Sequence, residues 1–389
     1  MTHDFDAIVV GLGGIGSGAA YWLTKRGAKV LALEQFELGH ARGESHDHSR
    51  IIRRSYVTPS YVRLASEAYG AWESLEHDAG EQVIFRTGGL DLGPRDGAIP
   101  LSGYADAMQA CGVPFEWLDA TEIRSRWPAF RIGDEVHGLY QSDGGIVAAE
   151  RATAAHQRVA GALGAVLRAE APVTRVREMS GGEIEVLAGG QWYRGAKLIV
   201  AAGPWSSRVL AWFDVRLPLE VTKEQAMYFE PRDADRFAFG HFPVWIWMDD
   251  PSFYGFPVFG EPGAVKVSQD AGGVPVDPDA RSFDEDLQIT RRVGEFLRRN
   301  LPDAFGPRRV VKTCLYTLTP DRDFVIDRLP EHPNVTVAIG AGHAFKFASL
   351  IGRILSELAL DGSARSDIAA FAVDRPILAM GAPPRTYMV

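Results

Sequence analysis

The stretch DAIVVGLGGIGSGAAYWLTKRGAKVLALEQ, residues 6–35, decides the fold of this 389-residue chain. Its first five residues, DAIVV, form an apolar run typical of a buried strand. A glycine-rich turn and helix-forming residues follow and stop at Gly27, and KVLALEQ, residues 29–35, predicts a second strand. Strand, helix and strand within about thirty residues make a βαβ unit.

Three glycines, Gly11, Gly13 and Gly16, occupy the turn between strand and helix with the spacing GxGxxG. The first allows a tight turn, the second lets a pyrophosphate approach the backbone, and the third lets the helix pack closely on the sheet. The helix N-terminus then favours phosphate charge. Glu34 ends the second strand, where a carboxylate can accept hydrogen bonds from ribose hydroxyls and disfavours a 2′-phosphate. The pattern predicts NAD or FAD rather than NADP.

The composition indicates a chain of more than one domain with large cores. Hydrophobic residues make up 46%, and the net charge of −9 argues against nucleic-acid or anionic-membrane binding. The two cysteines belong to no CxxC pair and cannot build a disulfide framework, and a zinc site is not expected. The acidic N-terminus is unlike a signal peptide, and no apolar run reaches the length of a membrane span. We expect a soluble cytoplasmic protein.

Nucleotide-type elements recur at the start, middle and end of the chain. Residues 196–210 and residues 334–360 each predict a strand, a glycine turn and a helix. Segments 83–140 and 218–276 are strand-like, and residues 283–301 predict a helix. The expected fold class is α/β, with a discontinuous Rossmann-like domain and a mainly antiparallel-sheet (α+β) substrate domain. The predicted division is 1–85, 142–215 and 310–380 for the cofactor domain, 86–141 and 216–309 for the substrate domain, and 381–389 for a tail.

Two further stretches bear on the cofactor. The turn from Ala201 to Trp205 is of the type by which flavoproteins return near the dinucleotide, although an ordinary strand-to-helix turn is the alternative. The stretch GHARGESHDHSRIIRRSY, residues 39–56, is dense in basic and imidazole groups and follows the strand that carries Glu34. It is either a solvated charged loop or a pocket wall whose buried arginines need an anionic partner, such as a substrate carboxylate or the flavin ring. Its histidines lack carboxylates at ligand spacing, so no metal is predicted.

The chain resembles the monomeric sarcosine oxidase family, which also contains N-methyltryptophan oxidase and pipecolate oxidase. The motifs that carry the resemblance lie in order across nearly the whole chain: GLGGIG with Glu34, SHDHSRIIR, YGFP, VKV, KTCLYTLTPDRDFVID and GAGHAFKFA. The resemblance implies FAD in a Rossmann-like domain, with a mainly antiparallel sheet over the isoalloxazine ring.

The cysteine of the KTCLYT motif, Cys314, is implied to carry the flavin through an 8α-S-cysteinyl link. A thiolate can add at the flavin 8-methyl group after that group loses a proton. The alternative is a small buried hydrophobe, which is also the expected role of Cys111. The expected cofactor contacts are Gly11, Gly13, Gly14, Ile15, Gly16, Glu34, Gln35, Ser45, His46, Ser49, Arg50, Val173, Ala202, Gly203, Trp205, Cys314, Gly342, His343, Ala344 and Lys346.

The resemblance also implies roles for charged residues around flavin and substrate. Arg53 and Lys346 would hold the substrate carboxylate, one by bidentate contact and one as a point charge. Lys266 would favour the superoxide that develops when dioxygen takes up an electron. Arg50 is a second cation beside the flavin, and His46 lies near the flavin face. The phenols expected to line the substrate pocket are Tyr254 and Tyr316.

The sequence departs from the family in two places. Asp270 stands where the family has a histidine, and a carboxylate near an anionic substrate is unfavourable unless it pairs with a cation. It is expected to contact a larger amine or to turn away. The run Trp245, Ile246 and Trp247 is bulkier than in members with small substrates. Both departures leave room for an N-alkyl amino acid other than sarcosine.

The predicted function is an FAD-dependent oxidase of secondary (N-methyl) amino acids such as sarcosine. The enzyme would oxidise the C–N bond to an imine that water hydrolyses, and O2 would become H2O2. N-Methyltryptophan, pipecolate or proline is an alternative substrate. A flavin amine dehydrogenase with another electron acceptor and a non-catalytic dinucleotide-binding protein are alternative classes. A monomer with no nucleic-acid or membrane partner is expected.

Overall fold

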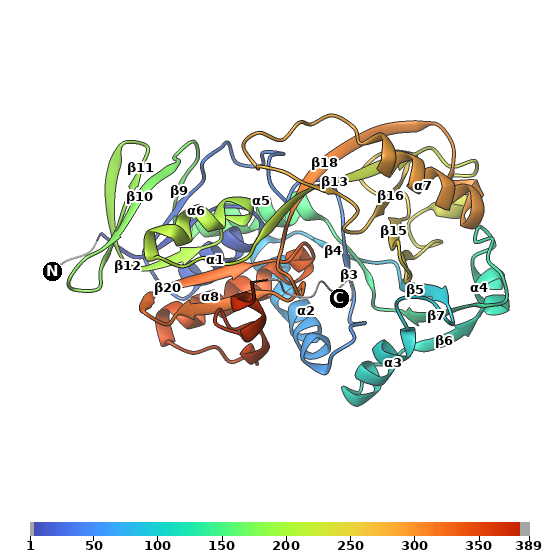
Figure 1. Cartoon of the computed structure of the whole chain (residues 1–389), viewed down its shortest axis with the longest axis horizontal. Helices are drawn as coiled ribbons and strands as arrows, with labels where there is room; N and C mark the ends of the chain where they lie inside the picture. Colours follow the sequence, from blue (N-terminus) through green and yellow to red (C-terminus); the bar gives the residue numbers. More distant parts are fainter. Residues whose placement is uncertain (1–3, 382–389) are drawn as a thin grey trace.

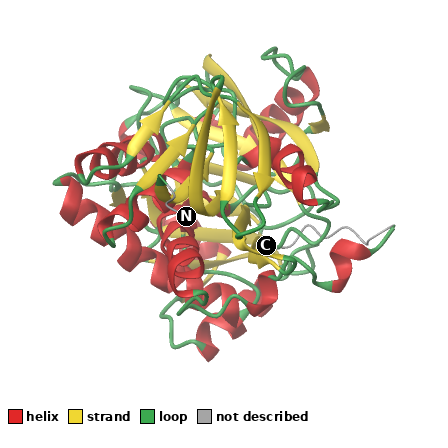
Figure 2. Cartoon of the chain, turned by 90° about the vertical axis from the view of Figure 1, so that its left-hand side faces the viewer, coloured by secondary structure: helices red, strands yellow, loops and turns green. Residues whose placement is uncertain are grey.

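The computed structural model describes residues 4–381, and two large sheets dominate it. The eight-stranded sheet and its helices lie at one end of the molecule, and the nine-stranded sheet lies at the other (Figure 1). Turned by 90°, the molecule shows its strands at the centre and most of its helices around them (Figure 2).

The eight-stranded sheet is built around the sequence that predicts the βαβ unit. In it, β1 (Phe5–Val10) pairs in parallel with β2 (Val30–Leu33) and with β12 (Gln191–Val200). Residues 7–10 of β1 and all four residues of β2 are buried, as expected for strands covered on both faces. The other strands are β9 (Val166–Arg168), β10 (Val173–Glu178), β11 (Ile184–Ala188), β19 (Val325–Leu329) and β20 (His332–Ile339).

Helices pack on this sheet through close backbone contacts. A Cβ atom on Gly352 of α8 (Ala348–Asp361) would lie 2.3 Å from the carbonyl carbon of Gly18 in α1 (Gly14–Lys25), so glycine lets the two helices touch. The remaining helices of this part are α2 (Pro59–Ala79), α5 (Ala149–Ala162) and the short α6 (Ser206–Leu210).

The nine-stranded sheet is antiparallel except for one strand pair, β5 (Gly89–Pro94) with β14 (Val244–Trp247). Its longest ladder joins β13 (Glu220–Phe229) to β18 (Arg308–Leu318), which are drawn as two long arrows side by side (Figure 1). A small third sheet consists of β3 (Arg50–Ile52), β8 (Gly145–Val147) and β4 (Ile84–Arg86), in that order. The other strands and helices are β6 (Glu116–Asp119), β7 (Val136–Gln141), β15 (Phe253–Phe256), β16 (Val265–Gln269), β17 (Val274–Pro275), α3 (Leu101–Ala110), α4 (Ala120–Arg126) and α7 (Leu287–Asn300).

The predicted fold class is confirmed, because parallel strands with helices form one part and a mainly antiparallel sheet forms the other. The division into domains stays a prediction, and β18 departs from it. This strand was assigned to the cofactor domain from residue 310, yet it is hydrogen-bonded to β13 of the nine-stranded sheet. The predicted tail, residues 381–389, lies outside the described residues beyond Gly381. None of the helices between residues 4 and 381 combines the length and hydropathy of a membrane span.

Candidate active site

The glycine turn after β1 can be formed only by residues without a Cβ atom. Gly11 has φ +95°, and a Cβ atom there would lie 2.4 Å from the carbonyl oxygen of Ala201. A Cβ atom on Gly16 would lie 1.9 Å from the carbonyl oxygen of Gly11, so this glycine lets α1 pack on the turn. The sequence interpretation of these two glycines therefore agrees with the geometry.

A cavity of about 440 Å³ opens in front of this turn and the N-terminus of α1. The Glu34 carboxylate at its wall accepts hydrogen bonds from the backbone N–H groups of Leu12 (2.9 Å) and Phe36 (3.2 Å). Burial raises the pKa of Glu34, but hydrogen bonds from His40 and the backbone outweigh it, so the pKa is lowered and the group is ionised. The predicted cofactor contacts that line this cavity are Gly11, Gly13, Gly14, Ile15, Glu34, Gln35, Ser45, His46, Val173, Ala202, Gly203 and Trp205.

A second cavity, of about 150 Å³, adjoins the first, since Ile15, Glu44, Ser45 and Gly340 line both. Side chains from many separate elements reach it, including β3, β15, β18 and the turn before α8. The predicted residues that the fold brings together here are Arg50, Arg53, Tyr254, Asp270, Tyr316, Gly342, His343, Ala344 and Lys346.

Four predicted residues, all within the described range, line neither cavity: Gly16, Ser49, Lys266 and Cys314. Gly16 is packed against Gly11, and the backbone oxygen of Ser49 accepts a hydrogen bond from Lys266 at 3.0 Å. Their expected contact with the cofactor stays a prediction.

Cys314 lies on a strand whose two faces differ. Thr313, Leu315 and Thr317 are buried, whereas Cys314 and Tyr316 between them are only half-buried. Alternate residues of a strand face opposite sides, so one face of β18 packs in the core and the other is less deeply buried. Burial raises the pKa of the Cys314 thiol to about 11, and the charge of Arg50 acts in the opposite direction.

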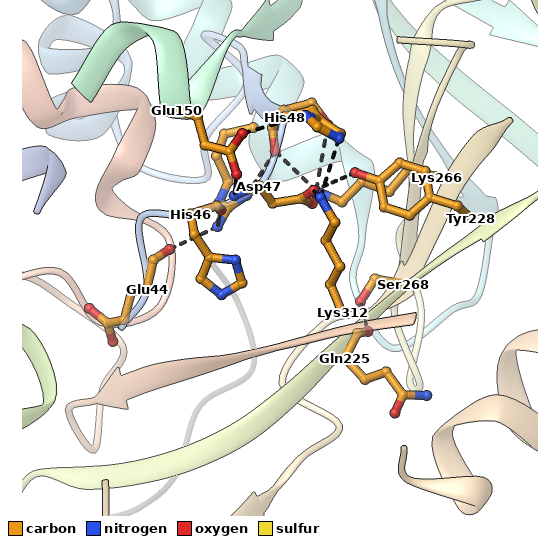
Figure 3. A network of polar contacts seen from close by, with 12 residues as sticks. Glu44, His46, Asp47, His48, Glu150, Gln225, Tyr228, Lys266, Ser268 and Lys312 are labelled. Carbon is orange, nitrogen blue, oxygen red and sulfur yellow. Dashed lines mark hydrogen bonds and ion pairs between the residues drawn. The ribbon is translucent and has the colours of Figure 1, made fainter. Parts of the chain in front are cut away.

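Lys266 belongs to a group of buried polar residues that we call the Asp47 cluster, formed by Asp47, Tyr228, Lys266 and Lys312. Figure 3 shows the two lysines and the phenol converging on the Asp47 carboxylate. The carboxylate lies 2.5 Å from Lys266 Nζ and 2.9 Å from Lys312 Nζ, and it accepts a hydrogen bond from Tyr228 Oη at 2.6 Å. Asp47 adopts φ +87°, which is unusual for a residue other than glycine.

The charged groups of this cluster stabilise one another's ionised forms. Burial raises the pKa of Asp47, but Lys266 and Arg50 outweigh that effect and leave the pKa well below its usual value. Burial lowers the pKa of Lys266, and Asp47 opposes that shift. The paired carboxylate therefore keeps positive charge on a lysine that is only 3% exposed.

The second cavity is lined by cations that are only partly paired. Arg53 donates to Asp91 at 3.0 Å, and Lys346 Nζ donates to the backbone oxygen of His343, also at 3.0 Å. Burial and the nearby Arg53 lower the pKa of Lys346 to about 7. Asp270 pairs with Arg322 at 2.8 Å. The aspartate that stands where the family has a histidine is therefore paired with a cation, which offsets its charge near an anionic substrate.

Three residues of the site were not predicted from the sequence. Arg322 is part of the quoted motif TPDRDF but was given no role, and Asp47 and Glu44 lie in the basic stretch that drew attention for its cations. Glu44 lines both cavities, and burial raises its pKa to about 7. A carboxylate inside a basic run was the signal for Asp47, because a buried lysine needs such a partner.

The residues of the first cavity fit a flavin dinucleotide. The glycine turn leaves room for a pyrophosphate at a helix N-terminus, and Glu34 is placed to accept hydrogen bonds from ribose hydroxyls. Burial and Arg50 lower the pKa of His46 to about 3, so this imidazole is neutral. Its Nε2 atom is buried with no hydrogen-bond partner in the described part of the chain, as is Oε1 of Glu44. Such atoms are expected where a ligand supplies the missing partner.

Comparisons with known proteins agree with this geometry. Residues 6–358 match the family model of FAD dependent oxidoreductases. The chain is 36% identical to a monomeric sarcosine oxidase of Streptomyces avermitilis, across 95% of this chain and 97% of that protein. It is 30% identical to an N-methyl-L-tryptophan oxidase of Salmonella arizonae, across 95% and 99%. The solved structure of NikD, an unusual amino acid oxidase essential for nikkomycin biosynthesis, superposes with a TM-score of 0.85 at 29% identity, covering 100% of this chain and 99% of that one.

These matches extend over nearly the full length of the chain, as the motifs of the sequence do, and they confirm both the resemblance and FAD as the cofactor type. The chain belongs to the FAD-dependent oxidoreductase family and, within it, to the group of the monomeric sarcosine and N-methyltryptophan oxidases.

Proposed function

We propose that the protein is an FAD-dependent oxidase of small secondary amino acids, which yields an imine and hydrogen peroxide. The observation that carries the proposal is a pair of cations, the buried Arg53 and the half-buried Lys346, in a small cavity that adjoins the cofactor cavity. A guanidinium and an ammonium in a cavity of this size suit one carboxylate of an amino acid. Relatives named for sarcosine and N-methyl-L-tryptophan support the same substrate class.

FAD, when bound, supplies two-electron oxidation of the amine and passes the electrons on to dioxygen. The residues of the chain bind and orient the substrate. Arg53, fixed by Asp91, brings a guanidinium to the carboxylate, and Lys346 adds a second charge. Tyr254 and Tyr316 line the cavity, and burial raises the pKa of both phenols, so both are neutral hydrogen-bonding groups. Lys266 holds positive charge beside the flavin for the reaction with dioxygen.

The size of the second cavity favours a small substrate over N-methyltryptophan. Its volume, about 150 Å³, is well below the ~300 Å³ at which pockets for drug-sized ligands begin. Of the bulky run at residues 245–247, Ile246 lines the cavity, while Trp245 and Trp247 pack around Phe296. The bulk noted in the sequence therefore acts mainly on the core.

A peroxide-coupled screen tests the function. Purified protein is offered sarcosine, N-methyl-L-tryptophan, L-pipecolate and L-proline, and oxygen uptake is measured beside peroxide. We expect one of the small amines to dominate. Substrate-dependent reduction of an artificial dye without oxygen uptake would instead show a dehydrogenase, and a colourless protein would rule out a flavoenzyme.

The covalent link to Cys314, the monomeric state and the cytoplasmic location are finer parts of the proposal. The half-buried face of β18 and the name of the monomeric sarcosine oxidase relative support the first two. After acid precipitation, the yellow colour is expected to stay with the wild-type protein and to leave the Cys314→Ser variant. Mass spectrometry of the peptide that contains Cys314 should show the added flavin. Cys111→Ser is the matched control, and its colour should remain. Release of all flavin from the wild type would contradict the link, and gel filtration would test the monomer.

A further inference from the structure

Arg322 has a free binding edge in the wall of the second cavity. Its guanidinium is buried, at 5% exposure for the residue, and Nη1 donates to Asp270 at 2.8 Å. The other two nitrogens, Nε and Nη2, are buried with no hydrogen-bond partner among residues 4–381. These two nitrogens form one side of the guanidinium, which can bind a carboxylate through two parallel hydrogen bonds. Donors buried without a partner are costly, so a ligand that accepts from them is favoured.

The backbone holds Arg322 in this position. The residue adopts φ +58°, its N–H donates to the backbone oxygen of Thr319 at 3.1 Å, and its own carbonyl accepts from His343 Nε2 at 2.9 Å. A non-glycine residue at positive φ costs free energy and persists where its surroundings fix it. The side chain is therefore directed at the cavity by the turn between β18 and β19, and not only by its ion pair.

The charges that line the cavity favour an anionic ligand. The lining cations are Arg50, Arg53, Arg322 and Lys346, against the carboxyl groups of Glu44 and Asp270. Burial raises the pKa of Glu44 to about 7, and burial with the charge of Arg53 lowers that of Lys346 to about 7, so the excess of positive charge lies mainly on the three arginines. One substrate carboxylate at Arg53 and Lys346 satisfies part of this excess and leaves the free edge of Arg322 without an acceptor.

We propose that Arg322 forms a second anion-binding subsite, and that the preferred substrates are N-methyl amino acids with a carboxylate in the side chain. The α-carboxylate lies at Arg53 and Lys346, and the side-chain carboxylate accepts two hydrogen bonds from Arg322. Asp270 is a positioning residue that holds the guanidinium by its third nitrogen. The inference rests on the proposed function for the reaction, which is unchanged, and concerns the identity of the substrate.

The test compares pairs of molecules that differ in the second carboxylate. For the flavin-loaded wild type, kcat/KM is measured with N-methyl-L-glutamate and N-methyl-L-norvaline, and the Kd of glutarate and of pentanoate is measured by calorimetry. We expect the dicarboxylate to be preferred by about 10- to 100-fold in each pair, the usual contribution of a charged, bidentate contact. The calorimetry needs no turnover.

The variant Arg322→Lys keeps the positive charge but removes the two parallel donors of the guanidinium. Arg322→Gln removes both the charge and the parallel donors. Both preferences should fall toward unity in these variants, with a smaller loss for lysine. Arg309→Lys, at an exposed arginine near the start of β18 that pairs with Glu230, is the matched control and should keep them. Flavin content is measured for each variant, and the wild-type comparison stands if a variant does not fold.

Three outcomes are distinguishable. A preference of the wild type for the dicarboxylates that disappears in Arg322→Gln supports the subsite. Preferences below about twofold in the wild type, or preferences that survive in Arg322→Gln, overturn it. If none of the amines is oxidised, the proposed function fails, and the ratio of the glutarate and pentanoate Kd values still decides the subsite.

Discussion

Two groups of charged residues in this molecule, the Asp47 cluster and the lining of the substrate cavity, differ in how far their polar atoms find partners within the chain. In the cluster, Lys266, Lys312 and Tyr228 all bind the Asp47 carboxylate. In the cavity, Arg322 keeps two buried nitrogens without a partner in the described range. A closed set of charges provides a fixed electrostatic field, whereas an open set is completed by a ligand. Substitutions in each group can separate the role of a fixed field from the role of a ligand site.

The largest effect is expected from Asp47→Asn, which removes the only charge of its sign in the cluster. Asparagine tolerates the positive φ of this position, so the backbone is not the variable. Breaking a buried ion pair costs about 3–5 kcal/mol, which for a chain of this size is a loss of roughly 4–6 °C in melting temperature. Differential scanning calorimetry measures it. An unchanged melting temperature would mean that the cluster is not held by Asp47.

Lys266→Met tests whether the Asp47 cluster favours the reaction of the reduced flavin with dioxygen. Loss of one preorganised charge slows the step that it favours by about 100- to 1,000-fold, so reoxidation by O2 should slow by this factor while flavin reduction changes much less. Stopped-flow absorbance separates the two half-reactions. Lys312→Met is the control, because Lys312 shares Asp47 but is more exposed. Normal reoxidation in Lys266→Met would remove this role from the lysine.

The smallest effect is expected in the pH dependence of anion binding in the substrate cavity. Burial and the charge of Arg53 lower the pKa of Lys346 to about 7, so it loses its proton as the pH rises through this value. An anion binds the protonated form better, and the Kd of pentanoate should therefore rise above pH 7 by at most about tenfold per pH unit. Calorimetry between pH 6 and about pH 9 measures it. Lys346→Met should bind more weakly with a flatter profile, and a steep profile in this variant would assign the titration elsewhere.

Local patterns predicted much of the fold and only part of the site. The glycine turn, Glu34 and the helix expected at 283–301, observed as Leu287–Asn300, depend on residues near one another in sequence. The strand-rich interpretation of 83–140 missed α3 and α4. The second of these begins with a capping box, Asp119 with Glu122, which was visible in the sequence.

The missed ion pairs have another cause. Asp47 meets Lys266, and Asp270 meets Arg322, only because separate strands and turns converge in the folded chain. Periodicity and spacing contain no information on such contacts. The family resemblance placed Lys266 and Asp270 but named no partner for either, although Asp47 and Arg322 both lie in motifs that carry the resemblance.

The strand β18 carries Lys312, Cys314 and Tyr316 at every second position: Lys312 belongs to the Asp47 cluster, Tyr316 lines the second cavity, and Cys314 is the proposed point of flavin attachment. Exchanging one of these side chains leaves the other two in place. Inserting or deleting a single residue upstream in the strand would instead rotate all three into the packed interior and bring Thr313 and Leu315 outward. Diversification of this enzyme should therefore proceed by substitution along the strand and should show a sharp intolerance of length changes there.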